Sequence, residues 1–485
     1  MSRPNILVIM SDDHAQWAAG CYGNADVDTP NLDYLAKTGV RFANAFTTSP
    51  VCSPARASFF SGRLPSQHGM HDYLNELDEE VRATRWLPKE RLLPEILHEQ
   101  GYTTGLSGKW HLGHDDAAPS GFDFWYSHSI EISRPDGYTA PWPTETPSGP
   151  GYDRHAITDK AVEFLRRRDH TKPFFLFVGH IATHSPWDNA PDRLVERYRE
   201  RALHPVHDDF TYPFGRLRSE SLYASRDDPR EALAQYYASV TDIDDQVGRL
   251  IDELELQGLS ESTVVVYTSD HGLNAGQHGI WGKGNGTIPY NVVDESIRVP
   301  LIVSFPTGIL GRQHRVENVD HTDTFATLLE LAGTTPPTDL HPTPYPGRSY
   351  VGPLMGRPQE ECADAVFVEY GNLRMTRTST MKLVKRYPDG PDELFALEHD
   401  PRESADVWDR PEFRAVRDEL EATLTSYFAR YDESDTSGLR VEDLPRHNLD
   451  EAWRDPGPAA IAADGAWMHR LEARIQNERQ RGENP

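Results

Sequence analysis

The sequence has few cysteines, few basic residues and no long apolar run. Cys21, Cys52 and Cys362 are the only cysteines among 485 residues, an odd and sparse set that excludes a disulfide framework. Lys and Arg number 49 against 76 Asp and Glu, so the formal net charge is −27. Because such a surface repels nucleic acid and anionic lipid, we expect neither partner, and an anionic substrate requires a concentrated local positive site.

The apolar runs are also too short for a signal peptide or a membrane-spanning helix. The first, at residues 6–10, is followed directly by Ser11, Asp12 and Asp13, which is too early an interruption for a signal peptide. No run approaches the ~18 apolar residues of a membrane span. We therefore expect a cytoplasmic protein.

Short apolar runs and helical patterns alternate along the first 330 residues. The length exceeds the roughly 250–300 residues that one core organises, so two or three domains are expected. We expect buried parallel strands at residues 5–10, 103–106, 174–178, 263–268 and 301–305. Helices are expected from residue 29 to Gly39 and at 93–100, 156–168, 231–257 and 322–332. This alternation predicts an α/β fold with a central, mostly parallel sheet flanked by helices.

A second, smaller domain is predicted after a Pro- and Gly-rich stretch at 334–358, which divides the chain into residues 1–358 and 359–485. Short alternating runs at 365–370, 374–378 and 381–387 predict an antiparallel sheet, and 411–430 predicts a helix. The polar C-terminal extension contains a helical pattern at 459–480. Residues 129–152 and 186–229 are expected as surface insertions around an active-site mouth.

Charged side chains follow four of the expected strands where each strand ends. In open α/β sheets, ligands bind beyond the carboxyl ends of the strands. The residues in question are Asp12 and Asp13 after the first strand, Lys109 and His111 after 103–106, His180 and His184 after 174–178, and Asp270 and His271 after 263–268. Any one of these groups could be a helix cap or a turn, but together they indicate a site at one edge of the sheet.

The carboxylates predict a bound cation. Asp12, Asp13 and Asp270 would each raise the pKa of the others if they converged, and a divalent ion relieves that repulsion. Oxygen-rich ligation favours Ca²⁺ or Mg²⁺, with Mn²⁺ as an alternative. The nitrogen of His271 shifts this balance slightly toward Mn²⁺ or Zn²⁺.

Cys52 occupies the expected start of a helix. Ser53 is suited to cap that helix, and Arg56 lies one turn inside it. The positive end of a helix lowers the pKa of a thiol or stabilises an anion, which makes Cys52 a candidate for chemistry. The alternative, a small buried apolar side chain, is the interpretation kept for Cys21 and Cys362.

The segment Cys52-Ser-Pro-Ala-Arg56 is similar to the Cys-x-Pro-x-Arg signature of the formylglycine-dependent (type I) sulfatases of the alkaline-phosphatase-like superfamily. The companion segments occur in the order of that family: Asp12-Asp13, Gly-Lys109-Trp-His111, Thr-His184-Ser-Pro, Asp270-His271-Gly, Gly-Lys283-Gly and a C-terminal segment at 393–403. The resemblance spans residues 4–405. It implies an alkaline-phosphatase-like α/β sandwich with a smaller C-terminal domain, and a hydrolase that cleaves small anionic sulfate esters of sugars or aryl alcohols.

The resemblance also implies a role for each site residue. A formylglycine-generating enzyme would oxidise Cys52 to Cα-formylglycine, whose hydrated aldehyde is the nucleophile. The implied metal ligands, with Ca²⁺ expected first and Mn²⁺ or Mg²⁺ as alternatives, are Asp12, Asp13, Asp270, His271 and the modified Cys52. The implied catalytic groups are Arg56 and Lys109 on the oxygens of the nucleophile, His111 as the proton acceptor during sulfate release, and His184 and Lys283 on the sulfate and the leaving group.

Two departures from the family pattern keep alternatives open. Sulfatases usually carry Asp-Asn where this chain has Asp270-His271, and Asp-His also occurs in phosphonate monoester and phosphodiester hydrolases and in choline sulfatases. Thr183 precedes His184 where proline is frequent, so His180 is an alternative to His184. A phosphonate monoester or phosphodiester hydrolase is therefore the second hypothesis, and a sulfated-ligand-binding protein with an unmodified Cys52 is the third. The sequence leaves the oligomeric state open.

Overall fold

The computed structural model describes residues 3–75, 79–113, 118–128, 138–139, 152–185, 187, 190–206, 216–217, 225, 228–309, 311–338, 341–357, 364–448 and 451–454. Across those ranges, no helix has both the length and the apolar content needed to cross a bilayer.

A nine-stranded sheet with the order β13-β2-β12-β8-β1-β6-β3-β4-β5 forms the centre of the molecule. Its strands are β1 (Asn5–Ser11), β2 (Val40–Phe46), β3 (Thr103–Gly108), β4 (Phe124–His128), β5 (Tyr138–Thr139), β6 (Phe174–Gly179), β8 (Thr263–Ser269), β12 (Leu301–Ser304) and β13 (Gln313–Asp320). Five of the eight neighbouring pairs are parallel, namely β1/β6, β1/β8, β3/β6, β3/β4 and β13/β2. The prediction of a central, mostly parallel sheet is confirmed.

The direction of β12 was predicted wrongly. This strand runs antiparallel to both β8 and β2. A parallel strand needs a crossover that returns the chain to the opposite edge of the sheet. Between β8 and β12 the chain forms only short elements at the edge where β8 ends, including α10 (Asp294–Ile297), so β12 starts at that edge and runs back.

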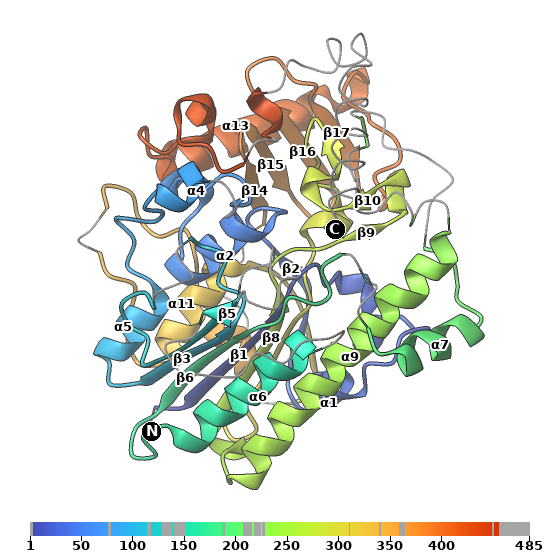
Figure 1. Ribbon diagram of the computed structural model, residues 1–485. Helices are drawn as coiled ribbons and strands as arrows, with labels where there is room; N and C mark the ends of the chain where they lie inside the picture. Colours follow the sequence, from blue (N-terminus) through green and yellow to red (C-terminus); the bar gives the residue numbers. More distant parts are fainter. Residues whose placement is uncertain are drawn as a thin grey trace.

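Helices cover both faces of this sheet, as Figure 1 shows. One face carries α2 (Cys52–Ser61), α5 (Leu93–Glu99) and α11 (His321–Leu331), and the other carries α1 (Pro30–Thr38), α6 (Tyr152–Arg167) and α9 (Pro229–Leu256). The alternation of side chains along β1 serves both layers. Ile6, Val8 and Met10 belong to the core with α2, α5 and α11, whereas Leu7 and Ile9 belong to the opposite core.

A separate antiparallel sheet follows in the C-terminal part of the chain (Figure 1). It consists of β14 (Val366–Tyr370), β15 (Leu373–Arg377), β16 (Met381–Arg386) and β17 (Glu393–Ala396), with α13 (Arg414–Tyr431) against it. The predicted sheet and helix are confirmed, and β17 is an additional strand. The domain boundary after residue 358 stays a prediction because 358–363 lie outside the described residues, as does the helix predicted at 459–480.

Shorter elements connect these layers. They are α3 (Pro65–His68), α4 (Glu79–Ala83), α7 (Asp192–Glu200), α12 (Val351–Leu354), the strand pair β9 (Asn274–Ala275) and β10 (Trp281–Gly282), and the pair β7 (Arg216–Leu217) and β11 (Thr287–Ile288).

The segment 186–229 is not wholly a surface insertion, in contrast to the prediction. Within it, α7 buries Leu194, Val195 and Tyr198 in a core shared with α9. Trp187 is also buried, and its Nε1 donates to the backbone oxygen of Thr183 at 2.8 Å. The apolar spacing on α7 therefore serves packing. Most of the other predicted insertion, 129–152, lies outside the described residues.

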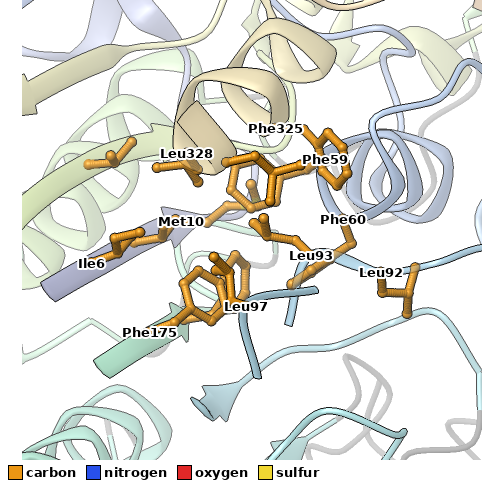
Figure 2. Close-up of a cluster of buried hydrophobic side chains, with 14 of the residues drawn as sticks. Ile6, Met10, Phe59, Phe60, Leu92, Leu93, Leu97, Phe175, Phe325 and Leu328 are labelled. Carbon is orange, nitrogen blue, oxygen red and sulfur yellow. The ribbon is translucent and has the colours of Figure 1, made fainter. Parts of the chain in front are cut away.

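The core beneath α2 couples the position of that helix to the sheet. Figure 2 shows Phe59 and Phe60 of α2 above Phe175 of β6, with Leu93 and Leu97 of α5 beside them. The ring of Phe60 lies 4.7 Å from that of Phe177 and 4.8 Å from that of Trp110. These contacts fix the helix whose first residue is Cys52.

Replacing Phe60 with Ala should therefore destabilise the whole protein. Loss of a buried aromatic side chain leaves a cavity and typically costs about 3–5 kcal/mol. Urea denaturation followed by circular dichroism measures the change in the free energy of unfolding. The matched control is Leu256→Ala, since Leu256 is 80% exposed at the end of α9. A Phe60 variant as stable as this control would show that the cluster does not anchor α2.

Candidate active site

The carboxyl ends of four parallel strands meet at one edge of the sheet. β8, β1, β6 and β3 are consecutive neighbours. Their register pairs Ser11 with Ser269, Met10 with Gly179, and Gly108 with Gly179. The residues that follow each strand therefore start at nearly the same height, and the structure brings all ten predicted site residues to this edge.

The backbone turns sharply where β1 ends. Consecutive side chains of a strand point to opposite faces, yet Asp12 and Asp13 both face the site. Asp13 has φ of 60°, a left-handed conformation that few non-glycine residues adopt. Its backbone oxygen accepts from the hydroxyl of Tyr236 on α9 at 2.9 Å. This turn allows two adjacent carboxylates to serve one site.

Cys52 is the first residue of α2 and is only 2% exposed. The predicted cap is wrong: the helix begins at Cys52, so Val51 is the N-cap residue, and no side chain caps the helix. Ser53 lies inside the first turn, and its Oγ instead accepts from the backbone N–H of Leu74 at 3.0 Å. The thiol nevertheless lies at the positive end of the helix, as predicted.

Three side chains from distant segments surround the sulfur of Cys52. Its Sγ is 3.1 Å from Lys283 Nζ, 3.3 Å from His271 Nε2 and 3.6 Å from Asp12 Oδ1. Burial alone raises the pKa of the Cys52 thiol, but the positive charges of Lys109, Lys283 and His271 bring that pKa well below its usual range. The site therefore stabilises negative charge at position 52.

Each buried carboxylate of the site touches a cationic side chain. Arg56 Nε is 3.0 Å from Asp270 Oδ2, and Arg56 Nη2 is 3.2 Å from Asp12 Oδ2. Lys109 Nζ also contacts Asp12 Oδ2, and Lys283 Nζ lies 2.8 Å from Asp13 Oδ1. The third guanidinium nitrogen of Arg56 donates to the backbone oxygen of Lys109 at 3.0 Å.

This arrangement corrects the electrostatic reasoning made from the sequence. The three carboxylates and the cations Arg56, Lys109 and Lys283 sum to zero formal charge, so repulsion among the carboxylates does not by itself require a metal. Burial raises the pKa of Asp12, but Lys109, His184 and Arg56 outweigh burial and hold that pKa below its ordinary value. Asp12 is therefore ionised at neutral pH.

His271 supplies a better indication of a cation site. Its Nδ1 lies 2.9 Å from the backbone oxygen of Gly272, an acceptor, so Nδ1 carries a proton and Nε2 faces the site. Nε2 is 3.3 Å from Asp13 Oδ1 and 3.5 Å from Asp270 Oδ1. Burial lowers the pKa of His271, but the negative charge of Asp270 outweighs burial and the pKa is about 9. The surroundings thus favour positive charge at this nitrogen.

Two overlapping groups of side chains have ligand atoms within 4.8 Å of one another. They are Asp12, Asp13, Cys52 and His184, and Asp12, Cys52, Asp270 and His271. Each group contains two carboxylates, one histidine and Cys52, and together the groups bring three carboxylates to the site, which fits a hard divalent ion.

The two histidines of interest occupy different sides of the site. His111 is buried, and its Nε2 donates to the backbone oxygen of Leu74 at 2.9 Å. His184 Nε2 lies 3.9 Å from Asp13 Oδ2, and its side chain is 21% exposed. One of the ligand groups contains His184, and neither contains the fully buried His180. The geometry therefore favours His184 over the alternative His180.

Several supporting residues carry no sequence signal. Asn291 donates from Nδ2 to the backbone oxygens of Lys283 and Gly284 at 3.0 and 3.1 Å, which fixes the lysine loop. At Gly272, a Cβ atom would lie 2.0 Å from the backbone oxygen of Glu295. The Asp-His-Gly segment contained the glycine, but nothing in the sequence marks Asn291.

Comparisons with known proteins agree with this geometry. Residues 4–334 match the family model described as Sulfatase, and residues 276–430 match the model of the N-sulphoglucosamine sulphohydrolase C-terminal region. The N-acetylglucosamine-6-O-sulfatase of Bacteroides thetaiotaomicron is 27% identical over 515 residues, covering 89% of this chain and 88% of that protein.

Two solved structures extend the comparison. One is a complex with its substrate D-glucosamine-2-N,6-O-disulfate; it has a TM-score of 0.76 and 25% identity and covers 90% of this chain and 99% of that chain. The phosphonate monoester hydrolase of Agrobacterium radiobacter has a TM-score of 0.71 at 21% identity, covering 88% of this chain and 96% of that chain, which shows a shared fold.

The sheet, its helical layers and the polar edge define a hydrolase of the alkaline-phosphatase-like superfamily. Within that superfamily the chain belongs to the sulfatase family, whose model covers more than half of its length. The protein is a sulfatase, an enzyme that hydrolyses sulfate esters.

Proposed function

We propose that Cys52, oxidised to Cα-formylglycine by a formylglycine-generating enzyme, supplies the nucleophile for sulfate monoester hydrolysis. The observation that carries this proposal is the convergence of Lys283, His271 and Asp12 on one buried sulfur. A hydrated aldehyde at this position offers one hydroxyl for attack on sulfur and a second whose deprotonation releases sulfate. Catalysis, rather than binding through an unmodified thiol, is what membership of the family supports.

The proposed metal ligands are Asp12, Asp13, Asp270, His271 and the modified residue 52, with Ca²⁺ expected first and Mn²⁺ or Mg²⁺ as alternatives. Two observations support this set: Asp12, Cys52, Asp270 and His271 offer ligand atoms within 4.8 Å of one another, and Asp13 Oδ1 lies 3.3 Å from His271 Nε2. Three of the five proposed ligands are carboxylates, which suits a hard cation. When bound, the cation adds a Lewis acid and two positive charges to a side-chain set of zero formal charge. The acidic chain then has the positive site that its substrate requires.

The remaining side chains are proposed to orient groups and move protons. Arg56 holds Asp12 and Asp270 in place and faces residue 52 from inside α2, and Lys109 holds Asp12. His111 is proposed to accept a proton from residue 52 during release. Two groups are proposed to bind the sulfate oxygens and protonate the leaving alcohol: His184, on the solvent-facing side, and Lys283.

Replacing Cys52 with Ala should abolish turnover and leave the fold intact, because the side chain becomes inert without gaining volume. Turnover of 4-nitrophenyl sulfate and the circular dichroism spectrum are the two measurements. Mass spectrometry across residues 51–56, after expression beside a competent formylglycine-generating enzyme, supplies the chemical control. A variant with most of its activity, or a fully active wild-type protein with an intact thiol, would refute the assignment of the nucleophile.

Replacing Asp270 with Asn should lose metal and turnover together, because one charged ligand disappears while the shape of the side chain is kept. Inductively coupled plasma mass spectrometry after dialysis gives the metal content per chain. The matched control is Asp159→Asn, a carboxylate that is 60% exposed on α6. Wild-type activity with metal still bound would remove Asp270 from the proposed ligand set.

We further propose that the substrate is a sulfated sugar. The support comes from the N-acetylglucosamine-6-O-sulfatase relative and from the solved structure whose substrate is a glucosamine disulfate. Trp187 has a ring suited to stack on a sugar, but it is buried and its Nε1 donates to the backbone oxygen of Thr183. Sugar contacts must therefore come from other side chains.

A panel of matched esters tests the substrate class. We expect kcat/KM for N-acetylglucosamine 6-sulfate to exceed that for 4-nitrophenyl sulfate by at least about ten-fold, the factor that one well-formed set of polar contacts supplies. A phenyl phosphonate monoester is the decisive comparison because Asp270-His271 also occurs in phosphonate hydrolases. Faster turnover of the phosphonate than of either sulfate would favour that second candidate function.

A further inference from the structure

The backbone of Leu74 connects the helix of the nucleophile to His111. Its N–H donates to Ser53 Oγ at 3.0 Å, and its oxygen accepts from His111 Nε2 at 2.9 Å. Leu74 itself is buried and belongs to the core that holds α2. One peptide segment therefore fixes both the residue next to Cys52 and the imidazole proposed to act on residue 52.

The partner of His111 determines which of its nitrogens carries the proton. A backbone carbonyl can only accept a hydrogen bond, so Nε2 must bear the hydrogen, and in the neutral ring Nδ1 keeps its lone pair. His111 Nδ1 is buried and is the ring nitrogen that Leu74 does not engage. A side-chain interaction with His111 is also one of the causes that lower the pKa of Cys52.

The segment 71–75 is held in turn by the C-terminal part of the chain. The backbone N–H of Asn75 donates to the backbone oxygen of His447 at 2.8 Å, and the N–H of His71 donates to His447 Nε2 at 3.0 Å. Asn448 Nδ2 donates to the backbone oxygen of Tyr73 at 3.0 Å. These contacts lie on both sides of Leu74.

His447 is itself fixed in one orientation. Its Nδ1 lies 2.8 Å from Glu451 Oε1, and the ring is fully buried beside Trp86. Because Nδ1 donates to a carboxylate, Nε2 is free to accept from the N–H of His71. Asn448 is also buried, with 1% exposure. His447 and Asn448, which hold residues 71–75 in place, are therefore themselves buried and hydrogen-bonded. They lie about 370 positions further along the chain.

We propose that Ser53, His447 and Asn448 are positioning residues that hold the carbonyl of Leu74 against His111, so that Nδ1 of His111 is the nitrogen presented to residue 52. This inference rests on the proposed role of His111 in the function above. His447 and Asn448 lie outside the catalytic motifs, so the C-terminal segment would also help to position a residue of the active site.

The tautomer of His111 gives a test that does not depend on turnover. The full-length protein, labelled with 15N-histidine and carrying the unmodified thiol, is measured by NMR, with His111→Gln used to assign the signals. We expect one tautomer protonated at Nε2 in the wild type and a mixture of tautomers in Asn448→Ala and His447→Leu. His447→Gln should restore the single tautomer because its amide can donate to Glu451 and accept from His71.

Kinetics of the matured enzyme provide the second readout. Misplacing an acceptor should lower kcat by about ten- to a hundred-fold while KM and metal content stay near wild-type values, in Asn448→Ala and in Ser53→Ala. Formylglycine content is measured for Ser53→Ala because that residue adjoins Cys52. The matched control is Arg440→Ala, an exposed side chain of the same C-terminal segment, which should leave both readouts unchanged.

Clear outcomes would overturn the proposal. A wild-type His111 protonated at Nδ1, or an unchanged tautomer in Asn448→Ala despite lower kcat, would show that these residues support only stability. If His447→Leu fails to fold, Asn448→Ala and Ser53→Ala decide. A wild-type protein without formylglycine or turnover would instead refute the proposed function, while the tautomer measurement would still decide the role of Leu74.

Discussion

The active site depends on the exact pairing of buried charges around Cys52. Moving one ion from water into a protein interior costs several kcal/mol, and removing one partner of a buried pair typically costs about 3–5 kcal/mol. Asp12, Asp13 and Asp270 are nearly fully buried, so each needs its cation. Arg56 comes from α2, Lys109 follows β3, and Lys283 follows β10. The pairing is therefore complete only when distant parts of the chain have folded together.

The same pairing connects stability to chemistry. Arg56 contacts two carboxylates and the backbone of Lys109, and it lies on the helix that starts with Cys52. A displacement of α2 would move Cys52, the proposed nucleophile, and break these charge contacts at the same time. This explains why the core under the helix is built from closely packed rings such as Phe60 and Phe177, which tolerate little change in volume.

The sequence predicted the central strands and the site residues at the strand ends for one physical reason, whereas Lys283 was found only through the family resemblance. Strands buried on both faces are continuous apolar runs, and each run ends where polar side chains begin, so both the strand and its carboxyl end are visible. The edge strand β13 alternates between exposed and partly buried residues, and β2 contains Arg41 and Asn44, so neither was recognised. The sequence of a short apolar strand such as β12 also does not indicate whether the strand runs parallel or antiparallel to its neighbours.

Contacts between distant segments could not be predicted from local patterns. Serine is a residue type that often caps helices. In the folded chain, however, the Ser53 hydroxyl accepts a hydrogen bond from the backbone N–H of Leu74, 21 residues away. The indole ring of Trp187 could stack on a sugar, but it is buried in the core that α7 and α9 share. Lone residues such as Asn291 and His447 belong to no motif. Their roles follow only from which backbone groups the folded chain places beside them.

An acidic protein can bind an anionic sulfate ester because salt screens the repulsion between exposed charges and the ester over short distances. At physiological ionic strength, exposed charges are screened over about 8 Å, so the formal charge of −27 acts weakly on an ester at a distance. Inside the buried site, screening by water and salt is small, and the paired side chains sum to zero. The single dication proposed for this site would then make it positive and confine recognition of the sulfate group to contact range.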